Sequence, residues 1–313
     1  MRLAFMGTPA FAVPALEVLL ETAGELVCAY TQPDKPKGRG LQLSLSPVKE
    51  RLLAARIAVR QPPTLKDDAA FAEFAALDLD LCVVAAYGKI LPRRYLEAPR
   101  LGCVNVHASL LPRYRGAAPI QWAIARAERE SGITLMQMDV GMDTGDILLM
   151  RALPIDPTDT GGTLEKKLAL LGAQLLREGL AQLRIAPLGR TQQDHAAATM
   201  APILKKEDGR VEWGKSPEEI AHLVRAMNPW PVAHTSHGGA LLKIFTAEPT
   251  ARIGDAAPGT VTLVSKSSGG RLEIACGTEA LALTELQTEG KKRLPIGPFL
   301  AGYRIAEGDV LGA

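Results

Sequence analysis

Short apolar runs alternate with stretches of helical periodicity over roughly the first 184 residues of the chain. The run from Leu79 to Ala86 is apolar without interruption, as in a strand of a parallel sheet that is buried on both faces. Residues 164–183 instead repeat leucine at the spacing of one helix face. The pattern predicts strands at 2–6, 26–31, 57–61, 79–86, 101–106, 133–138 and 147–155. It predicts helices at 9–20, 46–56, 65–77, 117–127 and 164–183.

This alternation predicts an α/β domain with a Rossmann-like, mostly parallel sheet, in which ligands bind beyond the carboxyl ends of the strands. The first strand is followed by Gly7-Thr-Pro9, where Thr8 is the expected N-cap and Pro9 the first helical residue. The dinucleotide fingerprint G-x-G-x-x-G is absent from this turn, so the sequence does not predict NAD binding.

The pattern changes after residue 184. Residues 185–207 form an expected extended linker, in which His195 has no obvious partner. Ser216-Pro-Glu-Glu219 is a capping box that predicts a helix to about Met227. The chain is therefore divided into a catalytic domain at 1–184, the linker, and a small OB-like β-barrel domain at 208–313. The strands of that second domain are expected at 240–247, 259–264, 271–275 and 281–286.

Composition narrows the class of protein without identifying it. The 313 residues are 47% hydrophobic and 22% charged, as in an ordinary soluble protein, and the net charge of +2 is not that of a strongly basic nucleic-acid binder. The four cysteines form no closely spaced pair, so we expect a reducing compartment with no disulfides and no metal site. No apolar run reaches the length of a membrane span and the first residues do not resemble a signal peptide, so we expect a cytoplasmic protein.

A basic segment interrupts the first domain. Residues 32–46 are rich in Pro and Gly, and we expect them to form a long irregular loop. This loop carries Lys35, Lys37 and Arg39. Such a loop is either a solvated surface or a flexible contact for a phosphate backbone.

The candidate chemistry lies at 102–146. Asn105 and His107 occupy alternate positions at the end of a strand and should project from the same face. A second polar loop presents Asp143 between two glycines. Each motif alone could be an ordinary turn. Together they provide a neutral hydrogen-bond donor, a proton carrier and an orienting carboxylate, a set suited to acyl-type transfer.

The complete string from Asn105 to Gly116, followed by Gly141-Met-Asp-Thr-Gly-Asp146, resembles the signature of folate-dependent formyltransferases. The resemblance extends over nearly the whole chain. The basic loop 30–40, Trp213, Pro229-Trp-Pro231 and Gly290-Lys-Lys-Arg293 are similar to the branch of this family that acts on methionyl-tRNA.

The resemblance implies transfer of a formyl group from 10-formyltetrahydrofolate to the amino group of methionine on initiator tRNA, without a metal. In this reaction Asn105 and protonated His107 donate hydrogen bonds to the oxyanion, while Asp143 orients His107 and accepts a proton through water. The segment expected to bind folate is Ser109, Leu110, Leu111 and Pro112, with Tyr87 and Gly88 beside the pterin.

For the tRNA, Arg39, Lys37 and Lys35 are expected at the acceptor end. Phosphates are assigned to Lys205, Lys206, Lys291, Lys292 and Arg293. Arg113 and Arg115 could contact either substrate. We expect a monomer. Two other classes of function remain open at this point: a formyltransferase or hydrolase that acts on a small amine or water, and a non-catalytic protein that binds tRNA or folate.

Overall fold

The computed structural model describes residues 1–21, 25–37, 42–251, 255–267 and 269–312. The chain forms two compact units. The first contains Met1–Pro119, Glu130–Pro154 and Glu165–Ala201, and the second contains Ile120–Arg129, Ile155–Leu164 and Pro202–Ala313. Each unit is described by itself.

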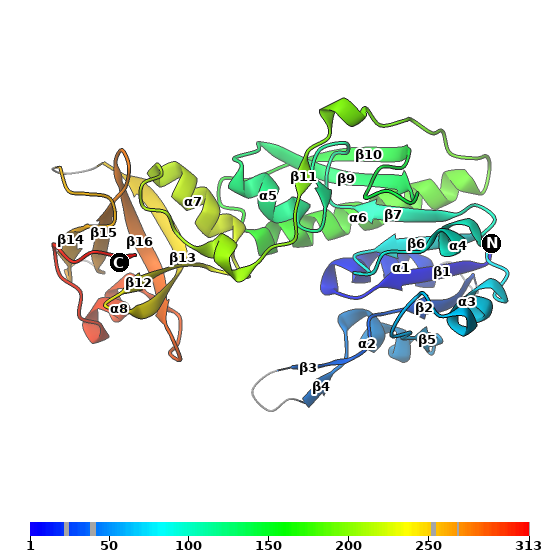
Figure 1. Ribbon diagram of the computed structural model, residues 1–313, viewed down its shortest axis with the longest axis horizontal. Helices are drawn as coiled ribbons and strands as arrows, with labels where there is room; N and C mark the ends of the chain where they lie inside the picture. The colour runs from blue at the N-terminus through cyan, green and yellow to red at the C-terminus, as the bar shows by residue number, and fades with distance from the viewer. Residues whose placement is uncertain (22–24, 38–41, 252–254, 268, 313) are drawn as a thin grey trace. The chain divides into compact units, whose positions relative to one another are not determined.

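The first unit is built on a seven-stranded sheet with the order β10-β9-β7-β6-β1-β2-β5 (Figure 1). The pairs β1–β2, β1–β6, β6–β7 and β2–β5 are parallel, whereas β9 is antiparallel to both β7 and β10. The predicted Rossmann-like, mostly parallel sheet is therefore confirmed. Its strands are β1 Leu3–Gly7, β2 Leu26–Tyr30, β5 Val59–Arg60, β6 Leu81–Ala85, β7 Cys103–His107, β9 Glu130–Gln137 and β10 Ile147–Pro154.

Two helices of this unit begin at a residue whose side chain caps the helix. The helix expected at 65–77 is α3 Asp68–Ala75, since Asp67 Oδ1 accepts the N–H of Ala70 at 3.0 Å. Ser46 caps α2 Pro47–Ala54 in the same way, as predicted. The remaining helices of this unit are α1 Val13–Glu21, α4 Arg93–Glu97 and most of α6 Gly161–Leu183, whereas α5 Pro119–Ala125 falls almost wholly within the second unit.

The long helix α6 packs directly on the sheet. A Cβ on Gly172 would come within 2.8 Å of Val106 on β7, so glycine is needed for this close approach. Leucines at the predicted spacing, Leu168 and Leu175, are at most 2% exposed. The predicted amphipathic helix is thus confirmed, and it supports the strand that carries the candidate site.

Two local predictions in the first unit were wrong. Thr8 does not cap a helix, because its hydroxyl donates to the carbonyl of Tyr87 at 3.2 Å and accepts the N–H of Gln32 at 3.1 Å. The segment 32–46, expected to be irregular, contains a two-stranded hairpin of β3 Lys35–Lys37 and β4 Gln42–Ser44. Arg39 lies outside the described residues.

The second unit contains an antiparallel sheet with the order β12-β13-β16-β15-β14, with β17 paired to β16. The four strands expected from the sequence are present, and β12 was not predicted. The capping box at Ser216 is confirmed as the start of α7 Pro217–Ala226. The strands are β12 Ala233–His237, β13 Ala240–Thr250, β14 Val261–Ser265, β15 Arg271–Ala275, β16 Ala280–Thr288 and β17 Leu294–Pro295, and a further helix is α8 Ile296–Gly302.

The core of the second unit lies between its sheet and its helices. Val224 of α7 and Leu300 of α8 are at most 1% exposed and belong to the same apolar cluster as Leu242, Ile274 and Leu286 of the sheet. Within the described ranges of the whole chain, no helix is both long and apolar enough to cross a membrane.

Candidate active site

The site begins where three neighbouring parallel strands end. Gly7 of β1 pairs with Ala85 of β6, and Val84 of β6 pairs with Asn105 of β7. The carboxyl ends of these strands therefore lie at one edge of the sheet, where α/β proteins bind their ligands. Asn105 and His107 leave β7 at this edge. The partly exposed Asn105 and the 5% exposed His107 are held by the strand itself.

Asp143 lies against both of these side chains. Its Oδ1 is 3.5 Å from Asn105 Nδ2, and its Oδ2 is 3.7 Å from His107 Nδ1. The backbone N–H of Gly116 donates to the same Oδ2 at 2.8 Å. Asp143 has a φ of 53°, in the left-handed region that residues other than glycine seldom adopt. The structure thus brings together the three residues that the sequence proposed as catalytic.

The ring of His107 is oriented by a backbone carbonyl. Its Nε2 lies 3.1 Å from the oxygen of Tyr114. Because a carbonyl oxygen can only accept, this contact assigns a hydrogen to Nε2. The nitrogen that faces Asp143 is then Nδ1, and it is the one available for proton exchange.

The expected folate segment 109–112 has a well-defined conformation. Ser109 Oγ donates to the carbonyl of Arg113 at 2.7 Å, so this hydroxyl already has an internal partner. Buried Thr134 donates to the carbonyl of Ser109 at 2.7 Å and accepts the N–H of Leu111 at 3.1 Å. The Leu111–Pro112 bond is cis. Leu110 and Pro112 are partly exposed, whereas Ser109 and Leu111 are buried.

Tyr87 and Gly88 present their backbone carbonyls, not side chains, at this part of the candidate site. The Tyr87 ring is 2% exposed and packs into the core, and burial raises the pKa of its phenol. Its carbonyl accepts hydrogen bonds from Thr8 and Gln32, and the carbonyl of Gly88 accepts from Gln32 at 2.8 Å. Gly88 has a φ of +78°, which favours glycine at this turn.

The cations proposed to bind tRNA are found in different settings. Lys35 and Lys37 belong to β3 of the hairpin. Lys205, Lys206, Lys291 and Lys292 are exposed on the second unit. Arg293 instead pairs with Glu285 and lies 4.3 Å from the ring centroid of Phe245, so its guanidinium already has two intramolecular contacts.

The sequence did not reveal the contribution of the segment around Gln193. His195, predicted to have no partner, lies with its Nδ1 3.0 Å from the Arg115 guanidinium, so that prediction was wrong. Arg115 is 6% exposed and also donates to Gln193 Oε1, at 2.6 Å from its NH2. Met200–Ala201 forms β11, a parallel partner of β8 Arg115–Gly116. The sequence gives no periodic signal for these contacts, because they are hydrogen bonds between a few residues that lie far apart in the chain.

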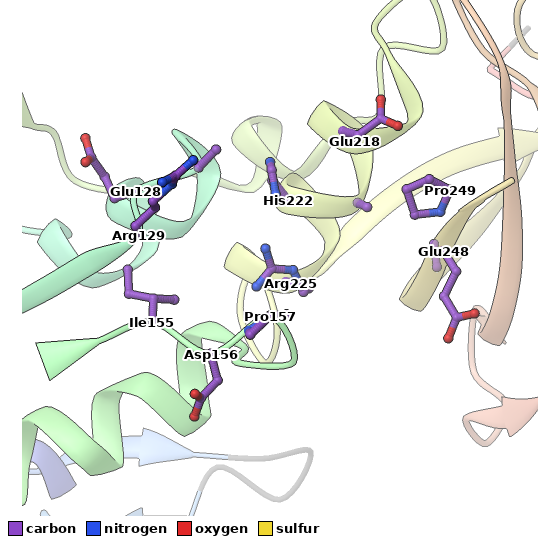
Figure 2. A pocket seen from close by; sticks show the side chains of 13 residues that line it. Glu128, Arg129, Ile155, Asp156, Pro157, Glu218, His222, Arg225, Glu248 and Pro249 are labelled. Carbon is purple, nitrogen blue, oxygen red and sulfur yellow. The ribbon is translucent and has the colours of Figure 1, made fainter.

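A cavity of about 440 Å³ lies within the second unit, away from these residues. In Figure 2, His222 and Arg225 of α7 stand between Arg129 and Glu248. Burial and the Arg225 guanidinium lower the pKa of His222. Of the predicted catalytic, folate and tRNA residues that the structure describes, none lines this cavity.

Comparison with known proteins gives the same domain pattern. Residues 1–180 match the family described as formyl transferase, and residues 203–304 match the formyl transferase C-terminal domain. A methionyl-tRNA formyltransferase of Geotalea uraniireducens (strain Rf4) is 47% identical over 314 residues, covering 100% of this chain and 98% of the relative. One from Citrifermentans bemidjiense is 46% identical over 312 residues, covering 100% and 96%.

Among solved structures, the N-formyltransferase of Helicobacter canadensis in complex with folinic acid and dTDP-3-aminofucose superposes with a TM-score of 0.68 at 19% identity. The match covers 92% of this chain and 99% of that one. At this identity the likeness shows the fold alone. The full-length relatives and the two matched domains show that this chain belongs to the formyl transferase family, on the branch of the methionyl-tRNA formyltransferases.

Proposed function

We propose that this protein transfers the formyl group of 10-formyltetrahydrofolate to the amino group of methionyl initiator tRNA, forming N-formylmethionyl-tRNA for translation initiation. The observation that carries the proposal is the full-length identity of 47% to a methionyl-tRNA formyltransferase. The convergence of Asn105, His107 and Asp143 at the sheet edge supports the chemistry.

The proposed mechanism assigns each side chain one role. The methionyl nitrogen attacks the formyl carbon, and the negative charge that develops on the formyl oxygen is stabilised by the amide of Asn105 and by protonated His107 through Nδ1. Asp143 keeps His107 oriented and accepts, through water, the proton that the amine loses. The carbon–N10 bond then breaks as this proton passes through water to N10, which releases tetrahydrofolate and the formylated amine.

The same proposal assigns the substrates to surfaces. The folate lies along 109–112 and the backbone at 87–88, at the strand ends. The tRNA is held by the basic residues of 35–39 near the reacting amine and by Lys205, Lys206, Lys291, Lys292 and Arg293 on the second unit. We propose a monomer that acts in the cytoplasm, where charged tRNA is available, and that requires no metal.

The test is formylation of charged initiator tRNA with 10-formyltetrahydrofolate. We expect wild type to be active and both His107→Ala and Asp143→Asn to lose activity by about a hundredfold or more. Asp139→Asn is the matched control, because an amide oxygen can still accept from the N–H of Gly141 and the hydroxyl of Thr144 in the same loop. Arg39→Ala should raise KM for tRNA far more than KM for folate.

Two results would contradict the proposal in different ways. A wild type that formylates only small amines refutes the tRNA assignment and leaves the chemistry intact. Full activity of His107→Ala refutes the catalytic assignment.

A further inference from the structure

The side chain of Gln193 is buried and fully hydrogen-bonded. It is 3% exposed, and its Nε2 donates to the carbonyl of Asp143 at 2.9 Å and to that of Gly145 at 2.6 Å. Its Oε1 accepts from Arg115 Nε at 3.1 Å and from Arg115 NH2 at 2.6 Å. A primary amide has two donors and two acceptor lone pairs, so all four are used.

These bonds connect the two loops that meet at the carboxylate of Asp143. One pair holds the backbone of the loop that carries Asp143. The other pair holds Arg115, and the next residue, Gly116, donates its N–H to Asp143 Oδ2 at 2.8 Å. Arg115 also receives support from the same segment, because its N–H donates to the carbonyl of Thr199 at 2.8 Å. Gln193 thus bonds to the loop that carries Asp143 and to Arg115, next to the Gly116 N–H donor, but it does not contact the Asp143 carboxylate itself.

We propose that Gln193 is a positioning residue, which sets the place of the Asp143 carboxylate relative to Asn105 and His107. Asp143 has a positive φ, a conformation that costs free energy and persists only where neighbouring groups hold it. The amide of Gln193 bonds the carbonyl of that same residue. Displacing a catalytic group by about 1 Å can cost on the order of a hundredfold in rate, so this hydrogen bond has kinetic consequences.

The chemistry of the position requires an amide. Leucine would remove the hydrogen-bond partner of the Asp143 and Gly145 carbonyls and of Arg115 Nε at a buried position. Glutamate would keep the contact with Arg115 but has no hydrogen to donate when ionised, so it would face two carbonyl oxygens with a negative charge. Both variants should therefore disturb the loop of Asp143, by different routes.

The inference rests on the proposed function, and a double-mutant cycle tests it. We would measure kcat and both KM values of the full-length chain for wild type, Gln193→Leu, Asp143→Asn and the double variant. Activity is expressed per tetrahydrofolate-binding site, so that unfolded protein does not count. The matched control is Gln192→Leu, since Gln192 is the adjacent glutamine and is exposed.

We expect Gln193→Leu to lower kcat by about tenfold to a hundredfold with both KM values nearly unchanged. Gln193→Glu should also lower kcat, and Gln192→Leu should match wild type. In the Asp143→Asn background the further loss should be less than about threefold, because residues that act as a unit are not additive.

Two outcomes would overturn the positioning role: the same loss of kcat in both backgrounds, which indicates a merely structural effect, or no loss in Gln193→Leu. Either of these leaves formylation by wild type intact. Failure of wild type to formylate methionyl-tRNA would instead contradict the proposed function.

Discussion

At the scale of single residues, the candidate catalytic groups are held by polar groups that take no part in the proposed reaction. The carbonyl of Tyr114 orients the His107 ring, the N–H of Gly116 holds one oxygen of Asp143, and Gln193 holds its backbone. Each of these contacts satisfies a group that would be costly to bury alone. The guanidinium of buried Arg115 donates to Gln193 and to the His195 ring, so it has two partners within the protein.

The stability of the protein should depend on pH through His222, which lies outside the candidate site. Burial and Arg225 lower the pKa of His222, so the folded protein binds fewer protons at this residue than the unfolded chain. Neutral His222 therefore leaves the unfolding free energy at its full value above the unfolded pKa of about 6.5. As pH falls from there through the folded pKa, protonation of the unfolded chain lowers the unfolding free energy. We therefore expect the unfolding free energy of wild type to fall more than that of His222→Gln between about pH 7.5 and about pH 5.

Urea unfolding of both proteins at the two pH values measures this difference. A gap between wild type and His222→Gln that stays constant with pH would mean that the two states bind protons equally at His222.

At the scale of secondary-structure elements, one helix cap predicted from local sequence is confirmed and another is not. The capping box at Ser216 forms as read from the sequence, with Glu219 N–H to Ser216 Oγ at 3.2 Å and Ser216 N–H to Glu219 Oε2 at 3.0 Å. Thr8 has the same cap chemistry in sequence but bonds to Tyr87 and Gln32 from neighbouring strand ends. The local sequence cannot show that backbone groups far away in the chain form hydrogen bonds with a hydroxyl that could otherwise cap a helix.

The capping box gives a stability prediction for α7. Ser216→Ala removes the acceptor for the Glu219 N–H at the helix start, and we expect a loss of about 1 kcal/mol in unfolding free energy. Ser216→Asp is the control, since its carboxylate can still accept that N–H, and it should stay close to wild type. Chemical denaturation measures both. Equal stability of Ser216→Ala and wild type would show that the cap contributes nothing here.

The same contrast explains what the sequence predicted of the site. Asn105 and His107 were predictable because strand periodicity places them on one face. Asp143 was predictable because it lies in a polar loop between two glycines. Gln193 was not, because the segment around it has no repeating pattern and its order comes from single bonds to Asp143, Gly145 and Arg115. The short strand pairs β3–β4 and β8–β11 escaped prediction for a similar reason, since strands of two or three residues exist only through their partner.

At the scale of the whole molecule, the sequence order and the compact units do not coincide. The first unit extends to Ala201, although the apolar periodicity ends near 184. The second unit includes Ile120–Arg129 and Ile155–Leu164 from within the catalytic half of the chain. We propose that the functional boundary lies after Ala201, because residues 191–201 hold the loops of the candidate site.

This boundary makes a prediction about fragments. A fragment ending at 184 lacks the carbonyl of Thr199 that accepts the Arg115 N–H at 2.8 Å and the carbonyl of Ala201 that accepts the Ala117 N–H at 2.9 Å. It also lacks Gln193. A fragment ending at 207 retains all three, and both fragments lack residues 208–313. If these bonds contribute about 2 kcal/mol net, the longer fragment should melt about 4–8 °C higher.

Thermal melts followed by circular dichroism compare the two fragments directly. Adding Gln193→Leu and Thr199→Ala to the longer fragment is the control, because Thr199 Oγ1 also accepts the N–H of Tyr114 at 2.9 Å. That variant should melt between the two fragments, since it keeps the backbone bonds to Thr199 and Ala201 but lacks the side-chain bonds to both loops. Identical melting of all three fragments would place residues 191–201 outside the catalytic unit and return the boundary to 184.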